Sequence, residues 1–358
     1  MSELGVFFAD AMNRVCQQHC PQPVIEEAER GTFPANFWEQ VRLLGIPLML
    51  VGEESGGIAA SVADTCALME VLGSHSTPGP VLETVVANLA LTLAGMDGID
   101  RPLALALTGD RTKVGGAEAG SAGAEIIIPR VAWGRELADL VAVVRREDRT
   151  MIARLETAQC EFEPLASLTG EPEYLLRVPA GLAEWVILDG AHTHDRLLRI
   201  AAIGRCAQMI GAMEWALEGA VGYASERIQF GRAIGKFQAV QHLLAAFASD
   251  LAATSAIYSD ARERFDEDDG ARLAAARARA GDAVDAAVSV SHQVYAAIGF
   301  SKEHGLNFRT RRLMKWRDDF GSTNYWRERI GRQLLGKNYE EVWKIISALG
   351  SSPDKRGL

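Results

Sequence analysis

The sequence lacks the features of several large protein classes. No run approaches the ~20 uninterrupted apolar residues that a membrane-spanning helix needs. The first residues carry Glu3 but no basic segment typical of a secretion signal. The five cysteines are an odd number without a CxxC pair, which argues against disulfides and against a thiolate zinc site. We therefore expect a cytoplasmic protein with no membrane partner.

Positive charge is also scarce. With 47 acidic and 37 basic side chains the formal net charge is −10, so a phosphate backbone would repel the chain. We expect neither DNA nor RNA as a partner. His192 and His194 form an HxH pair and His242 and His292 stand alone, without Cys or Glu neighbours at ligand spacing. A metal enzyme is therefore the least supported class, and we expect no metal site.

The length of 358 residues is enough for two or three packed units. Apolar residues from Gly5 to about Leu93 recur at helical spacing, which predicts an N-terminal helical domain over residues 1–100. Short β-rich runs separated by Gly, Asp and Pro then predict a small middle β domain over residues 101–189. The expected strands are Leu103–Leu107, Glu125–Ile128, Leu140–Val144, Met151–Leu155, Tyr174–Val178 and Trp185–Leu188.

Proline is absent from Arg196 until Pro353, where long segments rich in Ala, Leu, Arg and Glu occur instead. These segments predict a C-terminal four-helix bundle over residues 190–350 and a frayed tail over residues 351–358. Two breaks interrupt the bundle, at Phe230–Phe237 and at Gly299–Gly305. The expected fold class is therefore α+β and mainly α, in the order helices, strands, helices.

The longest motif covers the first break and reads Tyr223-Ala-Ser-Glu-Arg-Ile-Gln-Phe-Gly-Arg-Ala-Ile-Gly-Lys-Phe-Gln-Ala-Val-Gln-His242. It resembles the central signature of acyl-CoA dehydrogenases, Y-x-x-x-R-x-x-F-G-x-x-I-x-x-F-Q. The resemblance implies that Arg227, Phe230 and Gln238 reach an FAD held mainly by a neighbouring subunit, with the guanidinium at the pyrophosphate. Without the flanking pattern, Arg227 would be a helix-end cation and Phe230 a core residue.

A second motif, Gln293-Val-Tyr-Ala-Ala-Ile-Gly-Phe-Ser-Lys-Glu303, is similar to the family's Q-x-x-G-G-x-G-[FY]-x-x-E. In the family, the glutamine and the small residues let the backbone approach the adenosine-diphosphate end of FAD. The resemblance therefore assigns flavin contacts to Gln293 and Ala297. Ala296 and Ala297 stand where the family has two glycines.

The likeness extends over nearly the whole chain, but the β region departs from it. Phe37-Trp38 through Ile46 and Val51 through Gly57 resemble the family's N-terminal opening. In the family a strand of the β domain ends in L-T-E-P and touches the flavin. Here Thr108 remains, while Gly and Asp replace the Glu-Pro pair. The resemblance implies a flavin contact for Thr108.

The family's catalytic glutamate is missing at both places where it occurs. Counting from the motifs, these positions fall at Phe320 and near Ala201. Asp319 is the nearest candidate, because a carboxylate in a dry pocket can remove an α-proton from an acyl thioester. A shift of one residue rotates a helical side chain by ~100°. A solvated pair of Asp318 and Asp319 beside basic neighbours is the simpler interpretation.

Two functions remain open. In the first, the chain is an FAD-dependent acyl-CoA dehydrogenase, either alone with Asp319 as base or as the base-lacking half of a heteromer. In the second, it is an inactive chain that keeps the fold for assembly or binding. The basic run from Arg309 to Arg317 could serve a CoA phosphate or an interface, but a solvated helix face is the simplest expectation.

The resemblance also implies the partners. They are an acyl-CoA substrate and an electron-transfer flavoprotein-like acceptor. The assembly would be a homodimer, a tetramer or a heterotetramer with a second acyl-CoA dehydrogenase chain.

Overall fold

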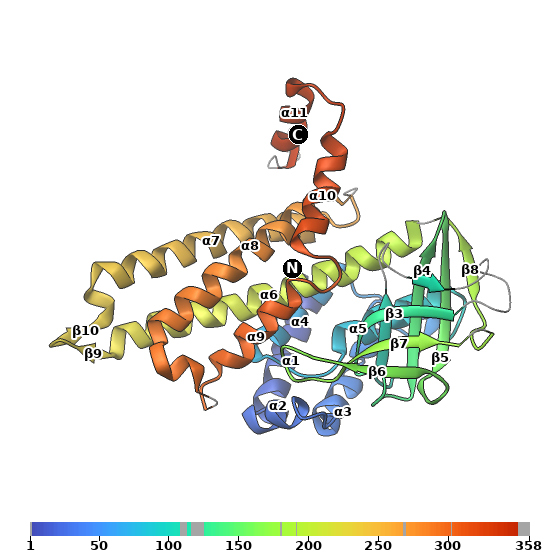
Figure 1. Cartoon of the computed structure of the whole chain (residues 1–358), viewed down its shortest axis with the longest axis horizontal. Helices are drawn as coiled ribbons and strands as arrows, with labels where there is room; N and C mark the ends of the chain where they lie inside the picture. The colour runs from blue at the N-terminus through green and yellow to red at the C-terminus, as the bar shows by residue number, and fades with distance from the viewer. Residues whose placement is uncertain are drawn as a thin grey trace.

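The computed structural model describes residues 2–107, 113–115, 125–179, 181–190, 192–267, 270–301 and 303–349. Within them, helices come first, then strands, then helices again, and Figure 1 shows most of the strands at one end of a long helical body. The predicted fold class, α+β and mainly α, is confirmed. None of the helices in these ranges is long and apolar enough to cross a membrane.

The N-terminal helices pack against α6 (His192–Glu226), the first long helix of the bundle. Their bounds are α1 (Glu3–His19), α2 (Gln22–Ala28), α3 (Ala35–Leu43), α4 (Val62–His75) and α5 (Val81–Leu93), with short turns η1 (Ile46–Leu48) and η2 (Glu53–Ser55). Helix α4 can cross α6 closely because Gly211 has no side chain. A Cβ at Gly211 would lie 1.9 Å from the carbonyl oxygen of Glu70.

The strands between the two helical regions form two sheets. Their bounds are β1 (Leu103–Leu107), β2 (Lys113–Gly115), β3 (Glu125–Ala132), β4 (Asp139–Arg146), β5 (Arg149–Glu156), β6 (Glu161–Leu165), β7 (Glu173–Val178) and β8 (Val186–Asp189). One sheet has the order β1-β4-β5-β8, with β1 and β4 parallel, and the other has the order β2-β3-β7-β6. All the predicted runs overlap these strands, whereas β2 and β6 were not predicted.

Successive side chains of strand β1 point to opposite faces of its sheet and belong to two different hydrophobic cores. Leu103 and Leu105 join the core shared by the N-terminal helices and the bundle. Ala104 and Ala106, on the other face of β1, join the core of the β region. One sheet is therefore covered on both faces, which fixes the β region against the helices.

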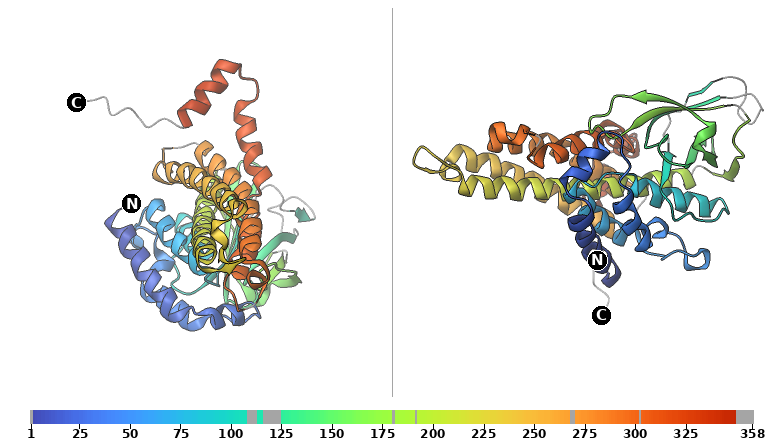
Figure 2. Two further views of the ribbon diagram at one scale, coloured as in Figure 1. Left: turned by 90° about the vertical axis from the view of Figure 1, so that its left-hand side faces the viewer. Right: turned by 90° about the horizontal axis from the view of Figure 1, so that it is seen from below.

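The bundle consists of α6, α7 (Gln238–Glu263), α8 (Ala271–Tyr295) and α9 (Leu306–Trp316). The segments β9 (Ile228–Gln229), β10 (Arg232–Ala233) and η4 (Ile234–Lys236) connect α6 to α7, and η5 (Ala296–Phe300) follows α8. Both predicted breaks are thus confirmed. Two further helices, α10 (Thr323–Leu334) and α11 (Tyr339–Leu349), rise from the side of the bundle formed by α7 and α8 (Figures 1 and 2). The domain limits at residues 100, 189 and 350 stay predictions.

Candidate functional site

The first motif forms the turn at the end of the bundle that carries β9 and β10 (Figure 1). Phe230 and Gly231 take positive φ angles of 52° and 78°, and the chain reverses there. The amide of Ile234 donates to the carbonyl of Arg227 and closes the turn. The Phe230 side chain is 93% exposed. The alternative interpretation of Phe230 as a core residue is therefore wrong.

Both motifs line one apolar groove of about 340 Å³. The turn contributes Phe230, the start of α7 contributes Phe237 and Leu243, and α8 contributes Gln293 and Val294. The Phe230 and Phe237 rings meet edge to face, with their centroids 6.2 Å apart. Phe237 and Leu243 were not singled out from the sequence, although Phe237 occupies a fixed position of the signature.

Three polar side chains of the motifs are exposed at this end of the bundle. Arg227, Gln238 and Gln293 have no side-chain hydrogen bond or ion pair with any residue that the structure describes. A permanent cation and two amides beside an apolar groove suit a ligand that combines rings with negative charge. The donor set therefore fits a dinucleotide such as FAD.

The second motif has a strained backbone where the resemblance places a glycine. Ala296 ends α8 with φ 54° and ψ −138°, a region that residues other than glycine rarely adopt. The next residue, Ala297, is small and exposed, so a ligand can approach the main chain there. A glycine at position 296 would adopt this conformation without strain.

Asp319, the candidate base, lies in a different part of the molecule, in a buried ion pair. Its carboxylate is 2.9 Å from Nζ of Lys315 and 3.3 Å from Nε of Arg205. Burial alone would raise the pKa of Asp319, but the two cations outweigh burial and lower the pKa below the usual 3.8. Asp318 is exposed. The interpretation as a solvated pair is therefore wrong for Asp319.

Arg205 connects Asp319 to the N-terminal helices. Its guanidinium bonds Glu83, in the first turn of α5, and Gln208, in α6. The ring of Trp316 lies 5.5 Å from its central carbon. Arg205 is buried, and a buried charge is tolerated only with such partners.

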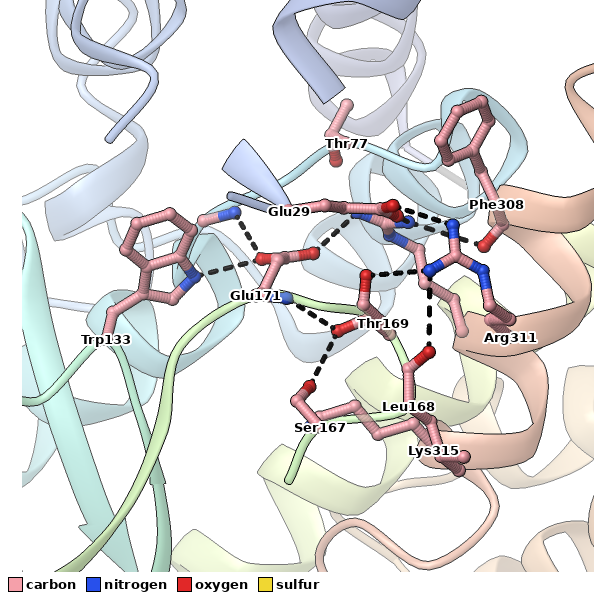
Figure 3. Close-up of polar contacts among 12 residues, drawn as sticks. Glu29, Thr77, Trp133, Ser167, Leu168, Thr169, Glu171, Phe308, Arg311 and Lys315 are labelled. Atoms are coloured by element: carbon pink, nitrogen blue, oxygen red, sulfur yellow. Dashed lines mark hydrogen bonds and ion pairs between the residues drawn. The ribbon is translucent and has the colours of Figure 1, made fainter. Parts of the chain in front are cut away.

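Three of the basic side chains of α9 bind acidic residues of two other parts of the chain. Arg312 is 1% exposed and bonds Glu29, at the end of α2, and Glu171, just before β7. Arg311 shares Glu29, as Figure 3 shows. These contacts form one group of side chains, which we call the ion cluster. Its members are Glu29, Glu171, Glu173, Arg311, Arg312 and Lys315. The expected solvated face is therefore wrong for α9.

Three members of this cluster, Glu171, Glu173 and Lys315, line a small polar chamber of about 30 Å³, together with Arg205 and Glu83. The indole Nε1 of Trp133 donates to Glu171 over 2.9 Å at its wall (Figure 3). Such a volume holds about two water molecules. The chamber in this state admits water and excludes an acyl chain.

Thr108 lies outside the described residues, so its expected flavin contact stays a prediction. Within the ranges that the structure covers, no group of three His, Cys, Asp or Glu side chains is placed to hold a metal ion. Of the residues predicted from the motifs, Phe230 and Gln293 line the groove. Arg227, Gln238 and Ala297 are exposed, and Asp319 lies in its ion pair with Lys315.

Known families match most of this chain. The acyl-CoA dehydrogenase N-terminal domain matches residues 6–97, and the acyl-CoA dehydrogenase C-terminal domain matches residues 189–335. The chain belongs to the acyl-CoA dehydrogenase family. The β region between the two matches is also where the sequence departs from the family's pattern.

Individual proteins resemble this chain in sequence or in fold. Acyl-CoA dehydrogenase IpdE2 of Mycobacterium tuberculosis is 28% identical over 322 residues, which cover 88% of this chain and 89% of the relative. A chain of the ChsE4-ChsE5 complex from Mycobacterium tuberculosis superposes with a TM-score of 0.82 at 21% identity, covering 94% of this chain and 99% of that chain. Butyryl-CoA dehydrogenase from Megasphaera elsdenii gives a TM-score of 0.80 at 16% identity, covering 94% and 99%. These two structures show the common fold.

Proposed function

We propose that this chain is one half of an FAD-dependent acyl-CoA dehydrogenase. It binds FAD at the groove together with a second acyl-CoA dehydrogenase-type chain, and that chain supplies the base for α,β-dehydrogenation of an acyl-CoA thioester. One observation carries the proposal. The flavin motifs meet at an exposed groove, whereas the acid nearest the expected base position is ion-paired with Lys315 and Arg205.

The exposed motif residues have distinct roles in this proposal. Arg227 binds the pyrophosphate with its planar set of donors. Phe230 packs against the cofactor, and Gln238 and Gln293 donate hydrogen bonds to it. Ala297 lets the main chain come close. When bound, FAD supplies the hydride acceptor for the dehydrogenation.

The state of Asp319 argues for a base from another chain. A general base for an α-proton works best with a raised pKa, and the pKa of Asp319 is lowered by Lys315 and Arg205 in spite of its burial. Two similar structures, the ChsE4-ChsE5 complex and the Tcur3481-Tcur3483 steroid ACAD, pair differently named chains. This supports a heteromer. Electrons would leave through an electron-transfer flavoprotein-like acceptor.

The small polar chamber favours a second candidate, an inactive subunit that serves assembly alone. Five ionised side chains, Glu83, Glu171, Glu173, Arg205 and Lys315, line it, and such a lining does not suit an apolar acyl chain. The two candidates differ in one measurable property. A flavin-binding half contributes to the bound FAD, and an assembly subunit does not.

The test compares Arg227→Ala with the control Arg332→Ala in the complex purified with the second chain. Arg332 is 67% exposed at its side chain and pairs with Glu328 on the surface of α10, away from the motifs. We expect Arg227→Ala to strip flavin absorbance from a complex whose size is unchanged on size exclusion, and Arg332→Ala to keep it. A fully flavinylated Arg227→Ala complex would favour the assembly role.

A further inference from the structure

A further cavity, of about 290 Å³, lies between the end of strand β4, the first turn of α6 and helix α10. Its volume is close to the lower limit of small-molecule sites, roughly 300 Å³. The lining is formed mostly by Arg145, Asp195, Tyr325, Glu328, Arg329 and Arg332. No aliphatic side chain of the described residues takes part in it. The cavity therefore suits a polar ligand and not an acyl chain.

The lining of this cavity carries a net positive charge. Glu328 pairs with Arg332 over 2.8 Å, and Asp195 accepts a hydrogen bond from a third residue, Arg329. Arg145 then remains, and it forms no ion pair with any residue that the structure describes. Acidic side chains outnumber basic ones, 47 to 37, in the chain as a whole. A cavity with an excess of positive charge is therefore unexpected, and it indicates a ligand of negative charge.

Arg145 and Arg329 both keep N–H groups that no described residue accepts. In Arg145, Nε donates to the carbonyl oxygen of Glu147 over 3.4 Å, and neither Nη atom has an acceptor among the described residues. In Arg329, Nη1 makes both hydrogen bonds, to Asp195 and to the hydroxyl of Tyr325. Its Nε and Nη2 have no acceptor in the part of the chain that the structure describes. A guanidinium presents its donors in a planar fork that matches the oxygens of a phosphate.

Arg329 is held in place before a ligand binds. Asp195 and Tyr325 hold Nη1, and the ring of Trp326 lies 5.4 Å from the central carbon of the guanidinium. At the start of α8, a Cβ added to Gly270 would lie 3.6 Å from Nη2. A guanidinium that is already fixed loses little side-chain entropy on binding.

We propose that this cavity binds the phosphate group of a small phosphate ester, with Arg145 and Arg329 as its two ligands. The several oxygens of a phosphate can accept hydrogen bonds from both guanidinium groups at once. The remaining volume has room for a ring beside Tyr325. A nucleic acid does not suit the site, because the net charge of −10 would repel a long polyanion.

This site goes beyond the proposed function. The cavity lies at the first turn of α6, and the flavin groove begins just after its last residue, Glu226. At 1.5 Å per residue, α6 separates the two sites within one chain by roughly 50 Å. A ligand in the cavity therefore does not occupy the groove of the same chain.

Adenosine monophosphate tests the ligand class, and adenosine is the control without charge. We expect isothermal titration of the full-length chain to give a Kd below about 1 mM for adenosine monophosphate. Inorganic phosphate should compete with it, and adenosine should not bind. Adenosine that binds as tightly as its monophosphate overturns the proposal. A chain that binds neither adenosine monophosphate nor phosphate overturns it as well.

A pair of matched substitutions tests the position of the site. Arg145→Gln removes a charge-assisted contact, so we expect it to weaken the binding of adenosine monophosphate by about tenfold or more. The control Arg149→Gln removes the same charge from the same hairpin. Arg149 is exposed and opposes Arg146 in the β4–β5 ladder, so its side chain points to the other face of the sheet. The control should change the affinity by less than about twofold, and equal weakening by both variants contradicts the proposal.

Arg227→Ala separates the cavity from the flavin groove. We expect this variant to bind adenosine monophosphate as the wild type does. If Arg227→Ala loses that binding while Arg145→Gln keeps it, the nucleotide lies in the groove and the proposed site is wrong. Flavin content, measured in the assembled complexes of both variants, reports on the groove and leaves the two proposals separable.

Competition against adenosine monophosphate distinguishes two sources of the phosphate ester. Coenzyme A carries a phosphate monoester on its ribose, and dephospho-coenzyme A lacks it. Competition by coenzyme A alone supports the nucleotide end of an acyl-CoA as the ligand. Competition by neither compound supports a separate phosphate ester.

Discussion

Lys315 Nζ lies 2.9 Å from a carboxylate oxygen of Asp319 and also 2.9 Å from one of Glu173, so a single ammonium group joins the turn after α9 to strand β7. Burial alone would lower the pKa of Lys315, but Asp319 and Glu173 outweigh burial and raise it above its usual 10.5. The role of Asp319 in this contact is structural, and it leads to the first prediction.

Replacing Asp319 by Asn should destabilise the fold and leave catalysis intact. The substitution removes a carboxylate shared by Lys315 and Arg205 and leaves these largely buried cations with Glu173 and Glu83 alone, which costs about 3 kcal/mol of unfolding free energy. Asp318→Asn, at the exposed neighbour, should cost less than about 0.5 kcal/mol. Urea unfolding measures both. Turnover by the assembled complex should be unchanged. Dehydrogenation by the single chain that falls by ~10²-fold in Asp319→Asn would instead identify Asp319 as the base.

Arg312→Met should loosen the contact between the three parts of the chain. It removes a buried guanidinium that bonds both Glu29 and Glu171, and the expected loss is about 3 kcal/mol. Arg332→Met, which breaks only the exposed pair with Glu328, should change stability by less than about 1 kcal/mol. Thermal unfolding of the two variants side by side decides the matter. Equal melting temperatures would show that the cluster contributes little.

Ala296→Gly should stabilise the protein. At φ 54° and ψ −138° an alanine costs about 1–3 kcal/mol of backbone strain, and glycine removes it while adding about 0.7 kcal/mol of unfolded-state entropy. Ala297→Gly lacks this strain and should destabilise by about 0.7 kcal/mol. A gain of stability in Ala296→Gly and a loss in Ala297→Gly would therefore indicate backbone strain at position 296. A loss of stability in both variants would refute the strain.

Mild acid should weaken the segment that carries the second motif. Burial lowers the pKa of His292 and of His304, and a positive neighbour lowers each further, His304 for the first and Arg309 for the second. The folded state therefore resists protonation. Its stability is fully present above the usual pKa of 6.5 and is lost as the pH falls below that value.

We expect the unfolding free energy to decline between pH 6.5 and about pH 5, as measured by urea titration at each pH. The double variant His292→Gln/His304→Gln should show a smaller decline over the same range. A slope as steep as that of the wild type would assign the effect to other groups.

Hydrophobic periodicity along the sequence was sufficient to predict most of the helices and strands. It failed where a strand lacks the apolar residues that are typical of strands. The apolar runs of β1, β4 and β5 gave clear strand signals because one or both faces are buried. Strand β6, Glu161–Leu165, contains Pro164 and two glutamates, and its side chains are mostly exposed. Its pairing with β7, which periodicity cannot show, is what makes it a strand.

Part of the candidate site could likewise be predicted from the sequence, and part could not. The groove could be predicted because each motif is contiguous and forms its turn locally, as the positive φ of Phe230 and Gly231 shows. The burial of Arg312 could not, since its carboxylate partners are 141 and 283 residues away. A basic helix looks the same in sequence whether its charges meet water or distant acids.

This separation along the chain has a consequence for the order in which the protein is made. Glu29 and Glu171 leave the ribosome before Arg312, which follows them by 283 and 141 residues along the chain. Before Arg312 is synthesised, Glu29 of the N-terminal helices and Glu171 of the β region lack the cation that they share. The contact between these two parts of the chain is then incomplete. A nascent chain stalled before α9 should therefore remain sensitive to protease at the junction of these two parts, and release of α9 should protect it.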